Sequence, residues 1–359
     1  MKTLTVTFHH GNNYGALFQM YALHSTIKSL GHDNIVLETR LTSSKENKAL
    51  TIRGILRTLF IRACRIYRAK KVSNLNKYFA DFKNNHVALT IPYTSMEELI
   101  ATPPIVEALI TGSDQVWNMT TIPSMIPSRF LDFGNPQAIR FSFAASIENM
   151  SYSESQIAYV KEQLKKFKGV SLREQSACRY IESITNIRTT YLLDPVFLLE
   201  RRDWESLAKK PRLDGPYILC YQVLSSRKMQ IVLNSLKKET GYPVVAVCNV
   251  PFKWVHSDYT LFDVSPEEFI GLYCNASYVV TTSFHGTALG ILFNKPTYSI
   301  PRSDSSNRIY DLMQLFGLEK FIVQDEHTLS MNAIDWKKIN GIIKSERSRS
   351  LQFLHDMLD

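Results

Sequence analysis

The chain has 359 residues, 45% of them hydrophobic and 21% charged, with 14 glycines and 14 prolines. This composition is typical of a globular protein, and the length allows two domains of ordinary size, each with its own core. No segment approaches the roughly 18–20 apolar residues of a membrane-spanning helix, and the apolar stretch near the N-terminus is too short for a signal peptide. The sequence therefore predicts a cytoplasmic protein.

Lysine and arginine number 42 and aspartate and glutamate 33, a net charge of +9. This excess favours anionic partners such as nucleic acids, phosphorylated metabolites, acidic glycans or an anionic membrane surface. No zinc finger, RNP motif or basic tail is present, so nucleic-acid binding is not predicted. The five cysteines are scattered and include no C-x-x-C pair, which argues against a disulfide framework and a thiolate metal site.

Strand and helix patterns alternate along the first half of the chain. Residues 3–8 predict a strand, 10–31 a loop followed by a helix, and 33–40 a second strand. Such a unit forms a right-handed crossover between parallel strands. The alternation continues with strands predicted within 105–118 and at 139–146, 169–174 and 189–199, and helices at 153–167 and 175–183.

A second alternating series follows the charged segment 203–216, which contains proline and glycine and is the best candidate for a domain boundary. Its strands are predicted at 217–223, 242–249, 277–283 and 296–300, and its helices at 227–241, 265–276 and 286–294. We expect an α/β protein with two doubly wound Rossmann-like domains. They cover residues 1–205 and 206–335, and a last helix within 336–359 is free to pack back on the first domain.

Residues 45–82 interrupt the alternation. Within 52–71 the apolar side chains fall on one helical stripe, and five arginines and a lysine cover the opposite arc. One interpretation is a surface helix that docks its apolar stripe on the domain. The other is a basic face that contacts an anionic membrane surface or a polyanionic substrate.

Ligands of open parallel sheets bind beyond the carboxyl ends of the strands, so site residues are expected in the loops there. The first loop, "HHGNNYGALFQ", holds Gly11 and Gly15 just before a helix. That geometry suits an anion or a sugar hydroxyl, although a tight turn explains the glycines equally well. The loop matches neither the dinucleotide-binding motif nor the P-loop.

Two further loops carry polar or aromatic side chains. In "TGSDQVWN", Asp114 could cap a helix or accept a proton from a substrate hydroxyl, and Trp117 offers a face for stacking on a sugar ring. In "VSLREQSA", Arg173 stands where a strand ends and a helix begins. Its guanidinium could hold a carboxylate or phosphate, or could simply pair with Glu174 or another acid.

The fourth loop, in "YVVTTSFHGTALGILFNKP", holds Ser283, His285 and Gly286. It lacks the G-x-S-x-G context of a nucleophile elbow, and His285 has no neighbouring metal ligands in the sequence, so no metal site is predicted. An acid–base role and a turn-packing role both remain open for His285. Arg308 leads the helix after the next strand and could face the same cleft.

Five stretches together resemble the polysaccharide pyruvyl transferase family. They are, in order, "NNYGALFQMYAL", "ITGSDQVWN", "VSLREQSACRYI", "LLDPVFLL" and "TTSFHGTALGILFNKP". The resemblance covers about residues 5–320, and five ordered motifs are far more specific than one. It implies two Rossmann-like domains that face a cleft, as in GT-B enzymes. It also implies transfer of a carboxyethylidene group from phosphoenolpyruvate to two hydroxyls of a sugar, with release of phosphate and no cofactor.

The resemblance assigns roles to individual residues. Asp114 matches an acidic position near the active site, Arg173 an arginine that binds phosphoenolpyruvate, and His285 a histidine that acts on it. We hypothesise that His285 is the general acid and that Asp114 takes the hydroxyl proton. Some members have an arginine where Ser283 stands, and Arg308 or Arg302 could replace it. The substrate-binding candidates are then Arg173, Asn13, Tyr14, Gly15, Trp117, Ser283, Gly286 and Arg308.

Two other functions compete with this one. A GT-B glycosyltransferase would use a nucleotide sugar, but the segment 287–290 lacks the acidic residues such enzymes usually place there. A non-catalytic glycan-binding or assembly protein would not need Asp114, Arg173 and His285 on three separate strand ends. The predicted partners are phosphoenolpyruvate and a saccharide acceptor. The basic face of 52–71 suggests a lipid-linked acceptor and contact with the inner face of the membrane.

Overall fold

The computed structural model describes residues 1–40, 74–147, 150–211, 213–223, 226–248, 255–301, 307–324 and 333–359. The basic stretch 52–71, predicted to contact a membrane surface, lies outside the described residues, as does Arg302. In the described part of the chain, no helix has both the length and the apolar character needed to cross a bilayer.

The first sheet has the strand order β2-β1-β3-β4, and all its neighbouring strands are parallel. A short parallel pair, β5 and β6, continues it through bridges from Phe141 to Gly169 and from Ala145 to Leu172. The bounds are β1 (Lys2–Val6), β2 (Asp33–Val36), β3 (Ala108–Thr111), β4 (Ile139–Ser142), β5 (Ser171–Leu172) and β6 (Thr190–Tyr191).

The second sheet has the order β11-β10-β7-β8-β9 and is also parallel throughout. Its strands are β7 (Ile218–Tyr221), β8 (Val244–Val247), β9 (Tyr259–Leu261), β10 (Tyr278–Thr281) and β11 (Thr297–Ser299). Every residue of β3, β7 and β8 is buried, as expected for parallel strands covered on both faces.

The helices fill the intervals between the strands. They are α1 (Tyr14–Ser29), α3 (Met96–Ala101), α4 (Ile126–Arg129), α5 (Glu154–Leu164), α6 (Gln175–Thr185), α7 (Arg201–Leu207), α8 (Arg227–Thr240), α9 (Pro266–Asn275), α10 (Phe284–Leu292), α11 (Asn307–Phe316) and α12 (Trp336–Leu358), with a further helical segment at 74–86. The described residues also form short 3₁₀ helices, which are η1 (Pro123–Met125), η2 (Pro195–Phe197) and η3 (Glu319–Phe321).

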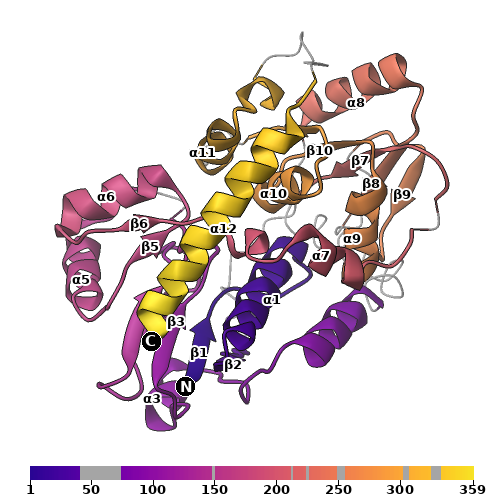
Figure 1. Ribbon diagram of the computed structural model, residues 1–359. Coiled ribbons are helices and arrows are strands. Elements are labelled where there is room, and N and C mark those ends of the chain that lie inside the picture. Colours follow the sequence, from indigo (N-terminus) through magenta and orange to yellow (C-terminus); the bar gives the residue numbers. More distant parts are fainter. Residues whose placement is uncertain are drawn as a thin grey trace, which may run out of the picture.

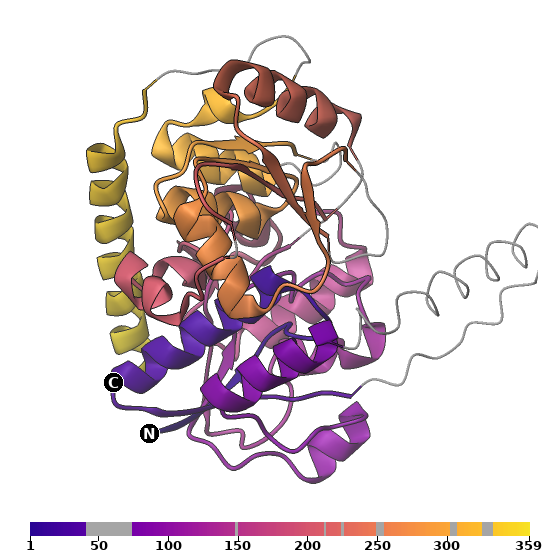
Figure 2. The ribbon, with the colours of Figure 1, turned by 90° about the vertical axis from the view of Figure 1, so that its right-hand side faces the viewer.

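The prediction of two doubly wound α/β domains in a GT-B-like arrangement is confirmed. Figure 1 shows the two domains one above the other, with α12 running across both, and Figure 2 shows α12 along one side of the molecule. Near its start, Ile339 and Ile343 belong to the core that contains the second sheet. Near its end, Leu354 and Leu358 pack with residues of α1 and the first sheet.

Helix α1 joins the domains directly. Tyr14, its first residue, stacks on Phe269 of α9 with ring centroids 4.0 Å apart and donates its hydroxyl to the carbonyl of Val264 at 2.6 Å. Both rings are buried, and they belong to a single hydrophobic cluster that reaches from α1 into the second sheet. The side chain of Tyr14 therefore belongs to the interface between the domains.

Each sheet reverses its strand order at one point, and loops on either side of that point diverge to leave a crevice. In the first sheet the point lies between β1 and β3, so the loops after these strands flank it. In the second it lies between β7 and β10, so the loop that leads into α10 flanks it. These loops and the first turn of α10 hold Asn13 and Asp114 of the first domain and Ser283 and His285 of the second.

Candidate active site

His285 lies in the first turn of α10. The helix begins at Phe284, two residues before the predicted start at 286. Ser283 is the N-cap, and its hydroxyl accepts a hydrogen bond from the backbone N–H of Gly286 at 3.2 Å. A Cβ on Gly286 would lie 2.3 Å from the hydroxyl oxygen of Thr281, so a glycine lets α10 start close to β10. Ser283 and Gly286 thus set the place of His285.

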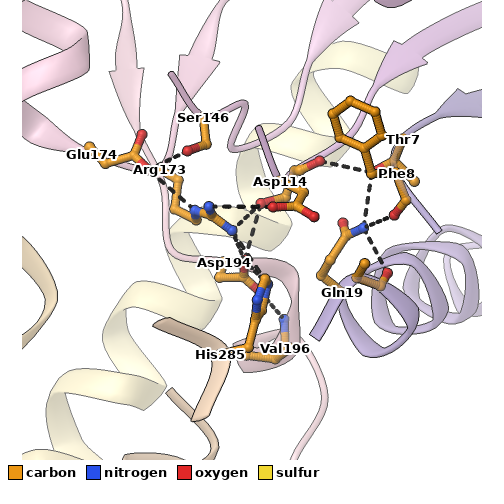
Figure 3. Close-up of polar contacts among 12 residues, drawn as sticks. Thr7, Phe8, Gln19, Asp114, Ser146, Arg173, Glu174, Asp194, Val196 and His285 are labelled. Carbon is orange, nitrogen blue, oxygen red and sulfur yellow. Dashed lines mark hydrogen bonds and ion pairs between the residues drawn. The ribbon is translucent and has the colours of Figure 1, made fainter. Parts of the chain in front are cut away.

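Asp194 joins His285 to Arg173 (Figure 3). One carboxylate oxygen of Asp194 lies 3.2 Å from Nε2 of His285 and 2.6 Å from a guanidinium nitrogen of Arg173, and it accepts from the Ser113 hydroxyl at 3.1 Å. The other oxygen accepts from the backbone N–H of Val196 at 3.0 Å. Asp194 is fully buried and begins η2, so a carboxylate from the first domain orients a histidine from the second.

Arg173 is surrounded by acids rather than exposed to a ligand. Its guanidinium contacts Asp194, Glu174 at 3.4 Å and Asp114 at 3.9 Å, and it lies over the ring of Phe284. The residue is 3% exposed and does not line the cavity described below. The prediction that Arg173 itself grips the donor anion does not fit this geometry, because the charge is already paired and enclosed. The alternative of pairing with acids, Glu174 among them, does fit.

The charges of the cluster shift its pKa values. Burial alone would raise the pKa of Asp194, but His285 and Arg173 hold it well below its usual range, so the group is a carboxylate. Burial raises the pKa of Glu174 against the opposing charges of Arg173 and Arg308. One oxygen of Glu174 accepts from the Ser146 hydroxyl at 2.5 Å. Burial lowers the pKa of Arg173, yet the neighbouring carboxylates raise it overall.

Asp114 faces the cavity from the loop after β3. Its φ of +70° is in the left-handed region, which a non-glycine residue adopts at some energetic cost. The conformation is held by its carbonyl, which accepts from the N–H groups of Val116 and Ser146 at 2.7 and 3.0 Å. The turn aims the carboxylate past Arg173 into the space between the domains (Figure 3).

A cavity of about 520 Å³ separates the two domains at this level, within the range of ordinary small-ligand sites. Asn13, Asp114, Ser283, His285 and Arg308 all line it, together with Phe8, His10, Ala16, Gln115, Thr121, Ile122, Val223, Thr282 and Phe284. Asn13 and Ser283 are the N-caps of α1 and α10, and Arg308 lies in the first turn of α11. Three helix N-termini therefore border the cavity, and their partial positive charge favours an anion there.

Gly15 fits the site for a steric reason. A Cβ at this position would lie 2.3 Å from Nδ1 of His285 and 2.6 Å from its Cβ. The imidazole therefore lies directly against the backbone of α1. Gly15 belongs to the site through this close approach, although its backbone is helical and needs no special φ.

Trp117 and Tyr14 do not line the cavity. Trp117 is 0% exposed, stacks on Phe130 with ring centroids 5.4 Å apart, and donates its indole N–H to the carbonyl of Arg129. The prediction that it stacks on a sugar does not fit this position, since the ring is fully buried in a hydrophobic cluster. Tyr14 holds the domain interface instead.

The sequence predictions missed Asp194, although its motif "LLDPVFLL" was one of the five. Residues 189–199 were predicted as a strand, which hid an aspartate that ends the strand pattern and caps η2. An Asp-Pro pair after an apolar run is a turn signal that could have identified it. Ser113 and Ser146, the hydroxyl partners of Asp194 and Glu174, carry no local signal.

The family model of polysaccharide pyruvyl transferase matches residues 13–304. No curated protein matches the sequence. Among solved structures, UDP-GlcNAc 2-epimerase from Methanocaldococcus jannaschii is similar with a TM-score of 0.49 and 10% identity, over 96% of this chain and 92% of that one. UDP-GlcNAc 2-epimerase from Neisseria meningitidis, bound to UDP-GlcNAc, gives a TM-score of 0.48 and 11% identity, over 100% and 99%. The family match covers most of the sequence, including the segments that hold Asp114, Asp194 and His285, and the chain belongs to the polysaccharide pyruvyl transferase family.

Proposed function

We propose that this protein transfers a carboxyethylidene group from phosphoenolpyruvate to two hydroxyls of a saccharide in a surface glycan or its precursor, and releases phosphate. The observation that carries the proposal is the Asp194–His285 pair at the wall of a cavity bordered by helix N-termini. Phosphoenolpyruvate is a small dianion or trianion with a carboxylate and a phosphate, and such a cavity favours anions.

The reaction needs one proton delivered to carbon and two hydroxyl protons removed. A proton adds to the methylene carbon of phosphoenolpyruvate and leaves an oxocarbenium-like centre. One sugar oxygen bonds to that centre, the carbon–oxygen bond to phosphate breaks, and the second sugar oxygen closes the cyclic ketal. Of the two hydroxyl protons lost, one balances the proton gained by the new methyl group, and the other leaves with phosphate.

His285 is the residue best suited to move these protons. Nε2 faces the carboxylate of Asp194, so this pair favours the tautomer with the proton on Nε2 and stabilises the imidazolium when it forms. Arg173 acts as a positioning residue, because its guanidinium holds the same carboxylate oxygen. The charged pair of Arg173 and Asp194 thus keeps His285 oriented without contacting the substrate itself.

Asp114 is the second proton-transfer group in the proposal. Its carboxylate is partly exposed, lines the cavity on the side opposite α10, and comes from the first domain. A sugar hydroxyl between Asp114 and His285 would have a base on one side and an acid on the other. Arg308 and the N-termini of α1 and α10 then remain to hold the donor's anionic groups.

The test is phosphate release from phosphoenolpyruvate in the presence of a panel of glycans. We expect His285→Gln to lower the rate by about 10²–10⁴-fold, because one general acid–base group contributes about that factor. The matched control is His256→Asn, a change at an exposed histidine of the second domain. Near-wild-type turnover by His285→Gln would remove histidine from the mechanism.

A nucleotide sugar tested in parallel separates the main alternative. If UDP-sugars bind and phosphoenolpyruvate neither binds nor releases phosphate with any acceptor, the protein is a glycosyltransferase and the proposal is wrong. If neither ligand binds, a non-catalytic glycan-binding role is favoured.

A further inference from the structure

His9 and Glu38 turn two hydrogen-bond acceptors toward each other, the Nδ1 lone pair of His9 and a carboxylate oxygen of Glu38. Nε2 of His9 lies 3.0 Å from the carbonyl oxygen of Leu37, and a carbonyl only accepts, so the proton is on Nε2 and Nδ1 carries a lone pair. Nδ1 lies 3.6 Å from a carboxylate oxygen of Glu38. Both atoms are buried, and neither has a hydrogen-bond partner among the described residues. A lone pair that faces a carboxylate in a buried place calls for a cation between them.

The His9 side chain is fully buried, and its Nε2–H is held by the carbonyl oxygen of Leu37. A neutral imidazole whose far N–H donates to a backbone carbonyl is the arrangement that most metal-binding histidines show.

His10 supplies a third donor atom beside the first two. One ligand atom from each of His9, His10 and Glu38 can be chosen so that all three lie within 4.8 Å of one another. The rings of His9 and His10 are stacked obliquely, with centroids 4.4 Å apart, and Nε2 of His10 lies 2.7 Å from the Thr39 hydroxyl. Donor atoms around a tetrahedral zinc ion are about 3.4 Å apart, so the His9–Glu38 distance already fits and His10 needs a small movement.

We propose that His9, His10 and Glu38 bind a divalent transition metal ion, with Zn²⁺ the ion that fits best. Two imidazoles and one carboxylate suit Zn²⁺ and related ions, whereas Ca²⁺ and Mg²⁺ prefer mostly oxygen ligands.

The site borders the cavity of the active site. His10 lines that cavity together with Asn13 and Asp114, and His9 and His10 lie in the loop after β1. Three protein ligands leave one tetrahedral position open. If the proposed function holds, this position takes an oxygen atom of the donor or the acceptor.

The experiment is a calorimetric titration with ZnCl₂ of the full chain, free of any affinity tag and stripped with a chelator. We expect one Zn²⁺ per chain, and at least a tenfold loss of affinity in Glu38→Gln and in His10→Asn. His256→Asn, which also removes one imidazole, should bind as wild type does. Unfolding temperatures measured in excess chelator check that the variants are folded. His10 is partly exposed, so His10→Asn still tests the site if Glu38→Gln does not fold.

Two results would overturn the proposal. One is that the wild type binds no stoichiometric Zn²⁺, and the other is that both variants bind Zn²⁺ with the affinity of the wild type. Co²⁺ in place of Zn²⁺ then tests the open position, because its visible spectrum reports coordination. A cobalt spectrum that phosphoenolpyruvate and acceptor leave unchanged refutes the open position alone. Since binding is measured without turnover, these outcomes are independent of the proposed reaction.

Discussion

The carboxylate of Asp194 connects the halves of the site, because one of its oxygens contacts Arg173 from the first domain and His285 from the second. All three groups are buried, so each charge depends on its partners. Removing one member of such a cluster leaves the others uncompensated, which costs far more than the pair contributes net. Function and stability are therefore coupled at this residue.

Asp194→Asn tests that coupling. The amide keeps the shape and the hydrogen bond from Val196 but loses the charge, so we expect about 3–5 kcal/mol less free energy of unfolding at pH 7. The pKa of Asp194 is lowered by folding, so its contribution is present above the unfolded pKa of about 3.9 and is lost as pH falls further. The difference between wild type and variant in denaturant titrations should therefore narrow only below about pH 4.

The control for this variant is Asp214→Asn, at an exposed position, which should change stability by less than about 0.5 kcal/mol. In phosphate release, Asp194→Asn and His285→Gln should each be slow, and the double variant should be little slower than either. Losses that multiply in the double variant would show that the two residues act separately.

Gly15→Ala tests the close approach of α1 to His285. The new Cβ would overlap the imidazole, which must move, and a displacement near 1 Å can cost about 10²-fold in rate. We expect that loss in phosphate release together with a lower unfolding temperature, because overpacking a buried contact destabilises the fold. Gly341→Ala is the matched control, because nothing lies near its Cβ position in α12. An active Gly15→Ala would mean that the position of His285 is not critical.

At the residue scale the sequence predicted where the site lies better than what each side chain does. Asp114 and His285 line the same cavity, as their positions after the ends of predicted strands indicated. Arg173 and Trp117 are enclosed, and their burial depends on Asp194 and Phe130, which lie at other points of the chain. His9, His10 and Glu38 were missed as a group because Glu38 follows the next strand.

At the scale of elements, local signals predicted helix starts well. Ser265 with Glu268 three residues later forms the capping box of α9, as that spacing indicates. Strands were predicted too long: β4 stops at Ser142 and β6 at Tyr191. After β4 the backbone turns at Ala144, with φ of +51°, and after β6 Asp194 starts η2. An apolar run alone does not separate a buried strand from the buried turn that follows it.

Helix α12 belongs to this scale, because it holds the two domains together. The guanidinium of Arg347, in α12, donates hydrogen bonds to the carbonyls of Phe197 and Leu199 at 2.8 and 2.9 Å. Ile339 and Leu354, 15 positions apart in the helix, pack in the cores of different domains.

Leu354→Ala measures that contribution. The side chain is fully buried beside Phe141 and Phe143, so we expect about 2–5 kcal/mol less free energy of unfolding. Gln352→Ala, on the exposed side of the same helix, should cost less than about 1 kcal/mol. A small effect of Leu354→Ala, measured by denaturant titration, would show that α12 is not required for the packing of the first domain.

At the scale of the whole molecule, two parallel sheets place their reversal points on facing sides of one cavity. The alternating strand and helix patterns were enough to predict this fold. They were not enough to predict how tightly the domains join, since the contact of Tyr14 with Phe269 links positions 255 residues apart. Long-range packing of this kind leaves no periodic signal.

The measurement that tests the central claim most directly is the mass of the acceptor after incubation with phosphoenolpyruvate and the protein. The proposed function predicts that the acceptor gains one carboxyethylidene group for each phosphate released, and that His285→Gln abolishes both at the same enzyme concentration. Phosphate released without a mass gain, or an acceptor that gains a sugar from a nucleotide sugar instead, would contradict it.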